Sequence, residues 1–221
     1  MPDAGSNGWS GRVLYNFKNT QTGFGPSGRL TFNSMGSLYG TTAGTFESKA
    51  GTVFKLSNTN KGWRHRTLWQ FNESDGAGPR YGVVFDKSGN LYGAANGGSS
   101  SCGEAPCGVV FELAPQRNGD WKEILLYQFP KPEDGSFPSS GVVFDKAGNL
   151  YGTTSNGGNP ACNGGCGVVY KLTLATNGKW RYVVLHKFNG QDGGYPGGDL
   201  AIDQRGNLYG TAYSVVYEIT P

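Results

Sequence analysis

The fold is decided by the stretch Gly148-Asn149-Leu150-Tyr151-Gly152-Thr153-Thr154, because close copies of it occur at three other places in the chain. The copies lie at residues 36–42, 89–95 and 206–212, and their tyrosines are between 53 and 59 residues apart. Repeats of roughly 40 to 50 residues are typical of β-propellers, in which each repeat forms one blade. The chain therefore consists of four copies of one blade-sized unit.

Each unit contains four short runs with the composition of β-strands, separated by turns rich in glycine and asparagine. In the third unit these runs are residues 141–145, 149–154, 167–172 and 180–188. Runs of this length that are bounded by turn residues indicate strands. Four antiparallel strands in each repeat are the blade pattern of a propeller.

The two ends of the chain indicate how the ring of blades closes. The last unit stops after its third run, whereas residues 9–17 begin with Trp and end with Phe, as every fourth run does. The fourth runs are residues 63–71, 121–129 and 180–188. We therefore expect residues 9–17 to complete the last blade, which leaves no exposed sheet edge at the seam. An open solenoid is the alternative, but it would not need its last strand supplied from residue 9.

The prediction is an all-β, four-bladed β-propeller with four antiparallel strands per blade, in one domain over residues 1–221. The blade repeats cover about residues 26–71, 79–129, 138–188 and 196–221, the last together with residues 9–17. Composition agrees with this architecture. The 38 glycines lack the three-residue period of collagen, and an aromatic content of 13% is too high for a disordered chain.

The repeat also resembles a known family. Its pattern is Asp-Gly-x-x-Pro, then Asp-x-x-Gly-Asn-Leu-Tyr-Gly-Thr-Thr, then Gly-Val-Val-(Phe/Tyr)-x-Leu. This pattern resembles the GloVer tandem repeat of bacterial extracellular proteins, and the resemblance covers nearly the whole chain. The resemblance implies export, often with a cell-surface anchor, and it implies no assigned reaction. The first unit departs from the pattern, with Thr22 and Asn33 where the other units have Asp.

Charge and hydropathy narrow the classes of partner. The net charge is only +3 and the basic residues are scattered, so we expect no nucleic-acid partner. No run of 18 apolar residues occurs, so we expect no membrane span. Residues 1–5 do not have the basic and apolar segments of a signal peptide, so none is expected in this sequence. We nevertheless expect a secreted or cell-surface protein, and a monomer.

The four cysteines form two tight pairs at equivalent points of the second and third units. Cys102 and Cys107 are separated by four residues, and Cys162 and Cys166 by three. A zinc site would bring both pairs together, but zinc knuckles favour two-residue spacers. We predict the disulfides Cys102–Cys107 and Cys162–Cys166, which imply an oxidising compartment.

One face of the propeller is the candidate functional surface. It carries the loops after the second and fourth strands, which include both cysteine loops and the Asp-Gly segments. Function tends to lie on long loops that a rigid scaffold holds. Three aspartates of this face are predicted to surround the axis: Asp75, Asp134 and Asp192. They could bind Ca²⁺, or two of them could act as acid and base on a glycosidic bond. The alternative is turn chemistry, because Asp-Gly is a common turn pair.

Next to these aspartates are residues that could line a ligand site, namely Phe24, Arg80, Tyr81, Phe137 and Tyr195. Aromatic rings stacked on sugar faces would suit a carbohydrate. The alternative is that the rings pack the bases of the loops. A second set of aspartates precedes the short turns of the other face and is expected to stabilise those turns: Asp86, Asp145 and Asp203.

The function predicted first is an extracellular binding module for glycans or a surface partner. It requires no cofactor, although calcium is a candidate. The alternative is a carboxylate-dependent carbohydrate-active enzyme, either a glycoside hydrolase or a polysaccharide lyase, with Asp75, Asp134 and Asp192 as catalytic residues. A scaffold without a small ligand is a third option. Propellers host unrelated functions, so the fold does not choose among these.

Overall fold

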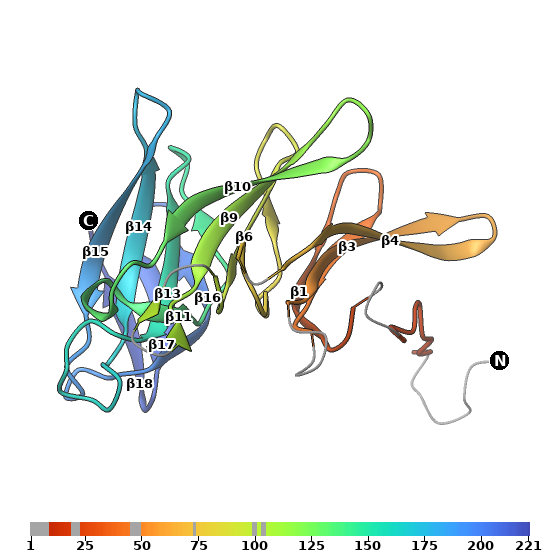
Figure 1. Cartoon of the computed structure of the whole chain (residues 1–221). Helices are drawn as coiled ribbons and strands as arrows, with labels where there is room; N and C mark the ends of the chain where they lie inside the picture. Colours follow the sequence, from red (N-terminus) through yellow and green to blue (C-terminus); the bar gives the residue numbers. More distant parts are fainter. Residues whose placement is uncertain (1–8, 19–22, 45–49, 73, 99–100, 103–104) are drawn as a thin grey trace.

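The computed structural model describes residues 9–18, 23–44, 50–72, 74–98, 101–102 and 105–221. In this part of the chain four antiparallel sheets follow one another in sequence, and they are arranged as the four blades of a β-propeller (Figure 1). The predicted all-β propeller is confirmed. Within the same residues, no helix is long and apolar enough to cross a membrane.

The strands of each blade pair in sequence order, from the first strand at the axis to the last at the rim. Blade 1 contains β1 (Pro26–Phe32), β2 (Leu38–Thr42), β3 (Thr52–Thr59) and β4 (Gly62–Gln70). Blade 2 contains β5 (Val84–Phe85), β6 (Leu91–Ala95), β9 (Val109–Pro115) and β10 (Trp121–Gln128). Blade 3 contains β11 (Ser136–Pro138), β12 (Val143–Phe144), β13 (Leu150–Asn156), β14 (Val168–Leu174) and β15 (Trp180–Lys187). Blade 4 contains β16 (Pro196–Ile202), β17 (Leu208–Ala212) and β18 (Val215–Ile219).

Three short elements lie between these strands. The pair β7 (Ser101–Cys102) and β8 (Ala105–Pro106) forms a small ribbon after β6. A single 3₁₀ turn, η1 (Pro132–Asp134), precedes blade 3. The first strand of blade 3 is interrupted, because both β11 and β12 pair with β13.

The repeated Leu-Tyr-Gly motif explains how each blade packs. Its glycine lies under an aromatic ring of the third strand, so a Cβ on Gly93 would be 2.6 Å from Cζ of Phe111. The preceding tyrosine points toward the next blade, where Phe85 meets Tyr39 and Phe144 meets Tyr92, with ring centroids 4.9 and 5.0 Å apart. The tyrosines of blades 1 to 3 are therefore part of the inter-blade cores.

The short turns between the first and second strands are held by their aspartates. In blade 3, Oδ1 of Asp145 accepts hydrogen bonds from the backbone N–H groups of Ala147 and Asn149, at 2.9 and 2.8 Å. Its Oδ2 accepts from Asn149 Nδ2 and from Tyr151 Oη. Burial alone would raise the pKa of Asp145, but these hydrogen bonds hold it below its usual value. Asp86 and Asp203 make the same contacts, so these carboxylates have the expected structural role.

The first strands of the four blades meet at the axis. Ser27 Oγ in β1 donates to the carbonyl of Arg80, 2.9 Å away. Ser139 Oγ at the start of blade 3 donates to the carbonyl of Pro196 in β16, 2.5 Å away. The backbone N–H of Gly198 returns a bond to the carbonyl of Ser139. Successive blades are therefore linked at the axis by hydrogen bonds as well as by apolar packing.

The seam between blades 4 and 1 differs from the prediction. Residues 9–18 contain no strand, and the sheet of blade 4 has only its three strands, with β18 paired to β17 alone. Instead, Leu14, Tyr15 and Phe17 pack against Phe54 and other core residues of blade 1. In Figure 1 this segment lies beside blade 1, and the C-terminus lies at the other side of the view. The structure does not show the strand pairing by which the last blade was expected to close.

Candidate functional site

The axis carries an ion pair rather than a ring of carboxylates. One position of the repeat, four residues before the turn Asn or Asp, is occupied by Arg29, Gly82, Gly141 and Asp199 in blades 1 to 4. Nη1 of Arg29 is 3.7 Å from Oδ2 of Asp199, and Nη2 donates to the carbonyl of Val142. A Cβ on Gly141 would be 2.8 Å from Oδ1 of Asp199. The two glycines therefore leave the space that the two charged side chains use.

The three predicted site aspartates are not brought together. Oδ1 of Asp75 accepts from the backbone N–H of Asn72, and Oδ1 of Asp192 accepts from that of Asn189. Oδ2 of Asp192 is 2.9 Å from Nε2 of His186. Each Asp-Gly segment follows the outermost strand of a blade, and these bonds fold the carboxylate back toward that strand. The geometry is therefore that of turns, as the alternative reading of Asp-Gly expected.

The predicted calcium site depends on these three aspartates lying close together. The described residues contain no group of three His, Cys, Asp or Glu side chains that could hold a metal ion. Asp134 lies in the 3₁₀ turn, and its carbonyl oxygen accepts a hydrogen bond from Tyr182 Oη of the rim strand β15. A shared site of Asp75, Asp134 and Asp192 at the axis therefore has no support in the described structure.

The disulfide expected in blade 3 is present. Cys162 is bonded to Cys166, with an S–S distance of 2.10 Å. Cys107 is also disulfide-bonded. The side chain of Cys102, the partner expected for it, lies outside the described residues. Among the cysteines that the structure describes, none is free.

Two aromatic residues of the predicted face have backbones that are unusual for their type. Phe137 and Tyr195 have φ values of 55° and 51°, in the left-handed region where residues other than glycine are uncommon. The equivalent residues of blades 1 and 2 are Gly25 and Gly78, with φ values of 61° and 63°. Strained conformations of this kind cluster at functional sites, because only surrounding structure can maintain them.

The disulfide-bonded loops hold these two residues in place. The N–H of Phe137 donates to the carbonyl of Cys107, and the N–H of Tyr195 donates to the carbonyl of Cys166, both at 2.8 Å. The hydroxyl of Tyr195 donates to the carbonyl of Asn163, 3.1 Å away. The backbone of each residue is thus fixed beside a cysteine loop of the preceding blade.

A pocket of 710 Å³ lies between the segment 132–137 and the cysteine loop of blade 3. Its walls include Glu133, Phe137, Asn156, Pro160, Cys162 and Asn163. This volume is within the range of about 300 to 1,000 Å³ that is usual for small-molecule sites. An aromatic ring beside amide and carboxylate groups suits a ligand with both apolar faces and hydroxyl groups.

The other predicted lining residues lie elsewhere. Phe24 and Tyr81 are half-buried and Arg80 is exposed, and none of them lines this pocket. Burial raises the pKa of Tyr81, which also has Asn96 as a hydrogen-bond partner. Of the five predicted lining residues, Phe137 is the one that the structure places in the pocket wall.

Sequence reasoning missed several residues that the structure makes prominent. The pocket residues Glu133, Asn156 and Asn163 belong to the 3₁₀ turn η1, to the end of β13 and to the cysteine loop of blade 3, and they were not among the predicted site residues. Arg29 and Asp199 had a detectable signal, since an alignment of the four units places them opposite two glycines. Glu123 of β10 had no detectable signal in the sequence, because the burial of its side chain depends on the neighbouring blade. Burial, with the charge of Asp75, raises the pKa of Glu123 to about 8.

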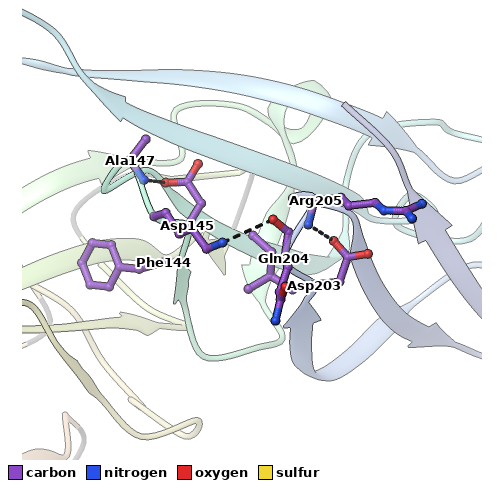
Figure 2. Close-up of a pocket in the computed structure, with 9 residues that line it drawn as sticks. Phe144, Asp145, Ala147, Asp203, Gln204 and Arg205 are labelled. Carbon is purple, nitrogen blue, oxygen red and sulfur yellow. Dashed lines mark hydrogen bonds between the residues drawn. The ribbon is translucent and has the colours of Figure 1, made fainter.

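A smaller pocket of 390 Å³ lies between the turns of blades 3 and 4 (Figure 2). It is lined by Phe144, Asp145, Lys146, Ile202, Asp203 and Arg205, among others. Nζ of Lys146 donates to the carbonyl of Gln204 across it, 3.5 Å away. Both aspartates are engaged by their own turns, so this pocket has fewer groups available for a ligand than the pocket at Phe137.

Comparisons with known proteins agree with the architecture. Among solved structures, a gluconolactonase from Xanthomonas campestris superimposes with a TM-score of 0.50 and 14% sequence identity. The match covers 86% of this chain and 55% of the gluconolactonase, so the chain spans little more than half the length of that protein. At this identity the likeness concerns the fold alone. Comparison with curated proteins found no match.

The family comparison covers nearly the whole chain. The model of the Gloeobacter/Verrucomicrobia repeat matches residues 4–218, which reach from the segment before blade 1 to the penultimate residue of β18 in blade 4. This is the family that the repeat pattern resembled. The chain therefore belongs to the Gloeobacter/Verrucomicrobia repeat family.

Proposed function

We propose that the protein is an extracellular glycan-binding module whose ligand occupies the pocket beside Phe137. The observation that supports this most is the left-handed backbone of Phe137 in the wall of a 710 Å³ pocket. Glycine stands at the equivalent place in blades 1 and 2. An aromatic residue that accepts this conformational cost has a use for its ring at that position.

The chemistry of the pocket fits a sugar. The flat face of a phenyl ring offers apolar area to the C–H groups of a pyranose, while Asn156 and Glu133 supply hydrogen-bonding groups. The loop bonded by Cys162 and Cys166 keeps the opposite wall in place. Such a preformed site loses little entropy when a ligand binds.

A glycan array run beside a polysaccharide depolymerisation screen tests the proposal. Phe137→Gly removes the ring but suits the backbone, as Gly25 and Gly78 do, so the fold should persist. We expect at least about tenfold weaker binding of the array's best glycan, which corresponds to the loss of about 1.4 kcal/mol. Tyr213→Ala, which removes an exposed aromatic ring outside this pocket, is the matched control and should bind as the wild type does. Unchanged binding by Phe137→Gly would show that the ligand lies elsewhere.

Glu123 supports a second candidate function, a carboxylate-dependent carbohydrate-active enzyme. With its pKa raised to about 8, this carboxyl is protonated at neutral pH, which is the state that a general acid needs. Asp75, whose charge contributes to the raised pKa of Glu123, would be the second carboxyl group of such a site. Depolymerisation that is lost in Glu123→Gln while glycan binding persists would favour the enzyme. Binding without any depolymerisation would favour the module.

A further inference from the structure

The free face of blade 4 carries residues that are buried in every other blade. Val216 of β18 is 79% exposed, whereas its equivalents Val53, Val110 and Val169 are all 0% exposed. The outer edge of β18 has no strand partner in the described structure. Blade 4 therefore presents an apolar face and a row of unpaired backbone groups, which is an edge that proteins normally cover.

Blade 1 presents the complementary face. Leu30 of β1 is 52% exposed, whereas Val83, Val142 and Leu200 at the same position of the other blades are between 1% and 4% exposed. Phe32, the equivalent of the phenylalanines that pack on Tyr39 and Tyr92, is also exposed. These two faces are the two halves of an inter-blade core of the kind that joins blades 1 to 4 elsewhere.

The N-terminal segment already lies in the place of a rim strand. Tyr15 stacks on His65 with ring centroids 4.5 Å apart, and Phe17 contacts Phe54 at 4.8 Å. At the junction of blades 2 and 3, the rim strand β10 does the same. Tyr127 stacks on Tyr182 at 4.1 Å, and Phe129 contacts Tyr170 at 5.5 Å. In the repeat alignment, the residues of the first junction are equivalent, in order, to those of the second: Tyr15, His65, Phe17 and Phe54 to Tyr127, Tyr182, Phe129 and Tyr170. Residues 9–17 therefore sit on blade 1 as the rim strand of a preceding blade would.

We propose that residues 9–17 pair with the free edge of β18 in the same chain and so close the ring of blades. The ion pair at the axis selects the chain's own blade 4 over a second copy. Arg29 and Asp199 replace glycine only in blades 1 and 4, which become neighbours only when the ring closes. Their 3.7 Å contact within one chain brings the inner ends of these two blades together.

The three complete junctions give the register of the pairing. In blades 1, 2 and 3 the third strand pairs with the rim strand as Phe54↔Thr67, Phe111↔Leu125 and Tyr170↔Val184. The equivalent pair at the seam is Tyr217 with Val13. One residue further along, Glu218 faces Arg12, so the register places opposite charges across from each other. Such cross-strand pairs stabilise a sheet.

The pocket in Figure 2 supports the same register. The corresponding pocket between blades 1 and 2 is lined in addition by Pro115 and Trp121 of the rim hairpin. Among the residues that the structure describes, no tryptophan lines the pocket between blades 3 and 4. The register brings Trp9 beside Pro221, the equivalents of Trp121 and Pro115. Closure thus supplies the tryptophan that this pocket lacks.

Cysteine crosslinking in the full chain tests the proposal. Arg12→Cys with Glu218→Cys places two thiols directly across the proposed pair, where Cα atoms roughly 4.5 to 5.5 Å apart allow a disulfide. We expect this bond within one chain after mild oxidation, read as a crosslinked peptide from the monomeric band of a non-reducing gel. The matched control is Arg12→Cys with Val216→Cys, which is out of register and should not crosslink.

Every other result overturns the proposal. A disulfide between two chains would show that β18 pairs with residues 9–17 of a second copy. Equal crosslinking of the control would show that the strands do not pair in the proposed register. Amide hydrogen exchange of the unaltered protein gives a second measurement. Closure predicts slow exchange at those amides of residues 215–219 that do not bond to β17. Fast exchange at these amides would show that the edge of β18 stays free.

Discussion

The junction between blades 2 and 3 and the seam between blades 4 and 1 use the same kinds of residue, yet among the described residues only the first has a rim strand that is hydrogen-bonded into a sheet. At the closed junction, Phe129 and Tyr170 are fully buried, and Tyr127 stacks on Tyr182 with the two ring planes 4° apart. At the seam, Leu30 and other apolar residues remain exposed. Apolar residues at the right repeat positions are therefore not sufficient to join two blades.

The difference lies in the rim strand. Tyr127 belongs to β10, which is hydrogen-bonded to β9, so the ring that packs on blade 3 is part of the sheet of blade 2. Tyr15 makes the same contact with blade 1, but no sheet lies behind it in the described structure. A rim strand joins blades because it belongs to one sheet and packs on the next. Strand pairing and side-chain packing must therefore occur together at the seam.

The largest effect is expected from a truncation at the closed junction. Phe129→Ala removes a fully buried ring that contacts Tyr127, Tyr170 and Tyr182, and should reduce the free energy of unfolding by about 3–5 kcal/mol. Phe32→Ala at the seam is the comparison. Closure of the seam should bury Phe32 and raise the cost of its truncation above about 1 kcal/mol, whereas an open seam would give about 0.5 kcal/mol, the usual value for a surface position.

Denaturant unfolding of both variants measures how far the seam closes in solution. A cost above about 1 kcal/mol for Phe32→Ala would indicate burial at the seam, because the exposed surface rarely gives so large an effect. Met35→Ala, at a more exposed position of the same blade, should have no effect and is the control. Equal costs for Phe129→Ala and Met35→Ala would contradict the contrast between the two regions.

The architecture was predictable because the repeat encodes it four times. The stretch 148–154 recurs with its glycine, which the third-strand aromatic requires, and with the aspartate, or in blade 1 the asparagine, that holds the preceding turn. The bond between Cys162 and Cys166 followed from equivalent positions in two units. Each of these features depends on local spacing, and local spacing is visible in a sequence.

The site was less predictable because it depends on directions and on neighbours. The sequence places Asp75 and Asp192 on one face, but the turn that follows a rim strand directs each carboxylate back to the backbone. The state of Glu123 depends on the adjacent blade. Phe137 could have been recognised as special, since it replaces a glycine that precedes a proline in two other blades.

The disulfide of blade 3 should have an intermediate effect. Replacing Cys162 and Cys166 by Ser opens a loop of five residues, and closing so short a loop contributes about 2 kcal/mol. Because the N–H of Tyr195 bonds to the carbonyl of Cys166, the change should also loosen the contact between this loop and blade 4. Unfolding monitored with and without a reductant measures the first effect. A reductant that destabilises the double Ser variant as much as the wild type would show that the other disulfide accounts for the change.

The last prediction concerns a pH-dependent effect at the junction between blades 1 and 2, where Glu123 stands at the position of Tyr182 in blade 3. Tyr182 donates a hydrogen bond to the carbonyl of Asp134, but Oε1 of Glu123 is buried with no hydrogen-bond partner in the part of the chain that the structure describes. Burial first, and the charge of Asp75 second, raise the pKa of Glu123 from 4.5 to about 8. This junction therefore holds an acid that prefers to keep its proton.

The folded state thus binds a proton more tightly at Glu123 than the unfolded state does. Stability that this group contributes is present in full below pH 4.5 and is lost as the pH rises toward about 8. Glu123→Gln keeps the shape of the side chain and removes the titration, so its free energy of unfolding should vary less with pH across that window. Thermal melts of both proteins between these pH values measure this difference in pH dependence. Burial also raises the pKa of Glu112, but that group is present in both proteins, so its contribution cancels when the two are compared. Parallel profiles for the two proteins would mean that Glu123 is hydrated and ionises normally, and the contrast between this junction and that of blades 2 and 3 would then be one of shape alone.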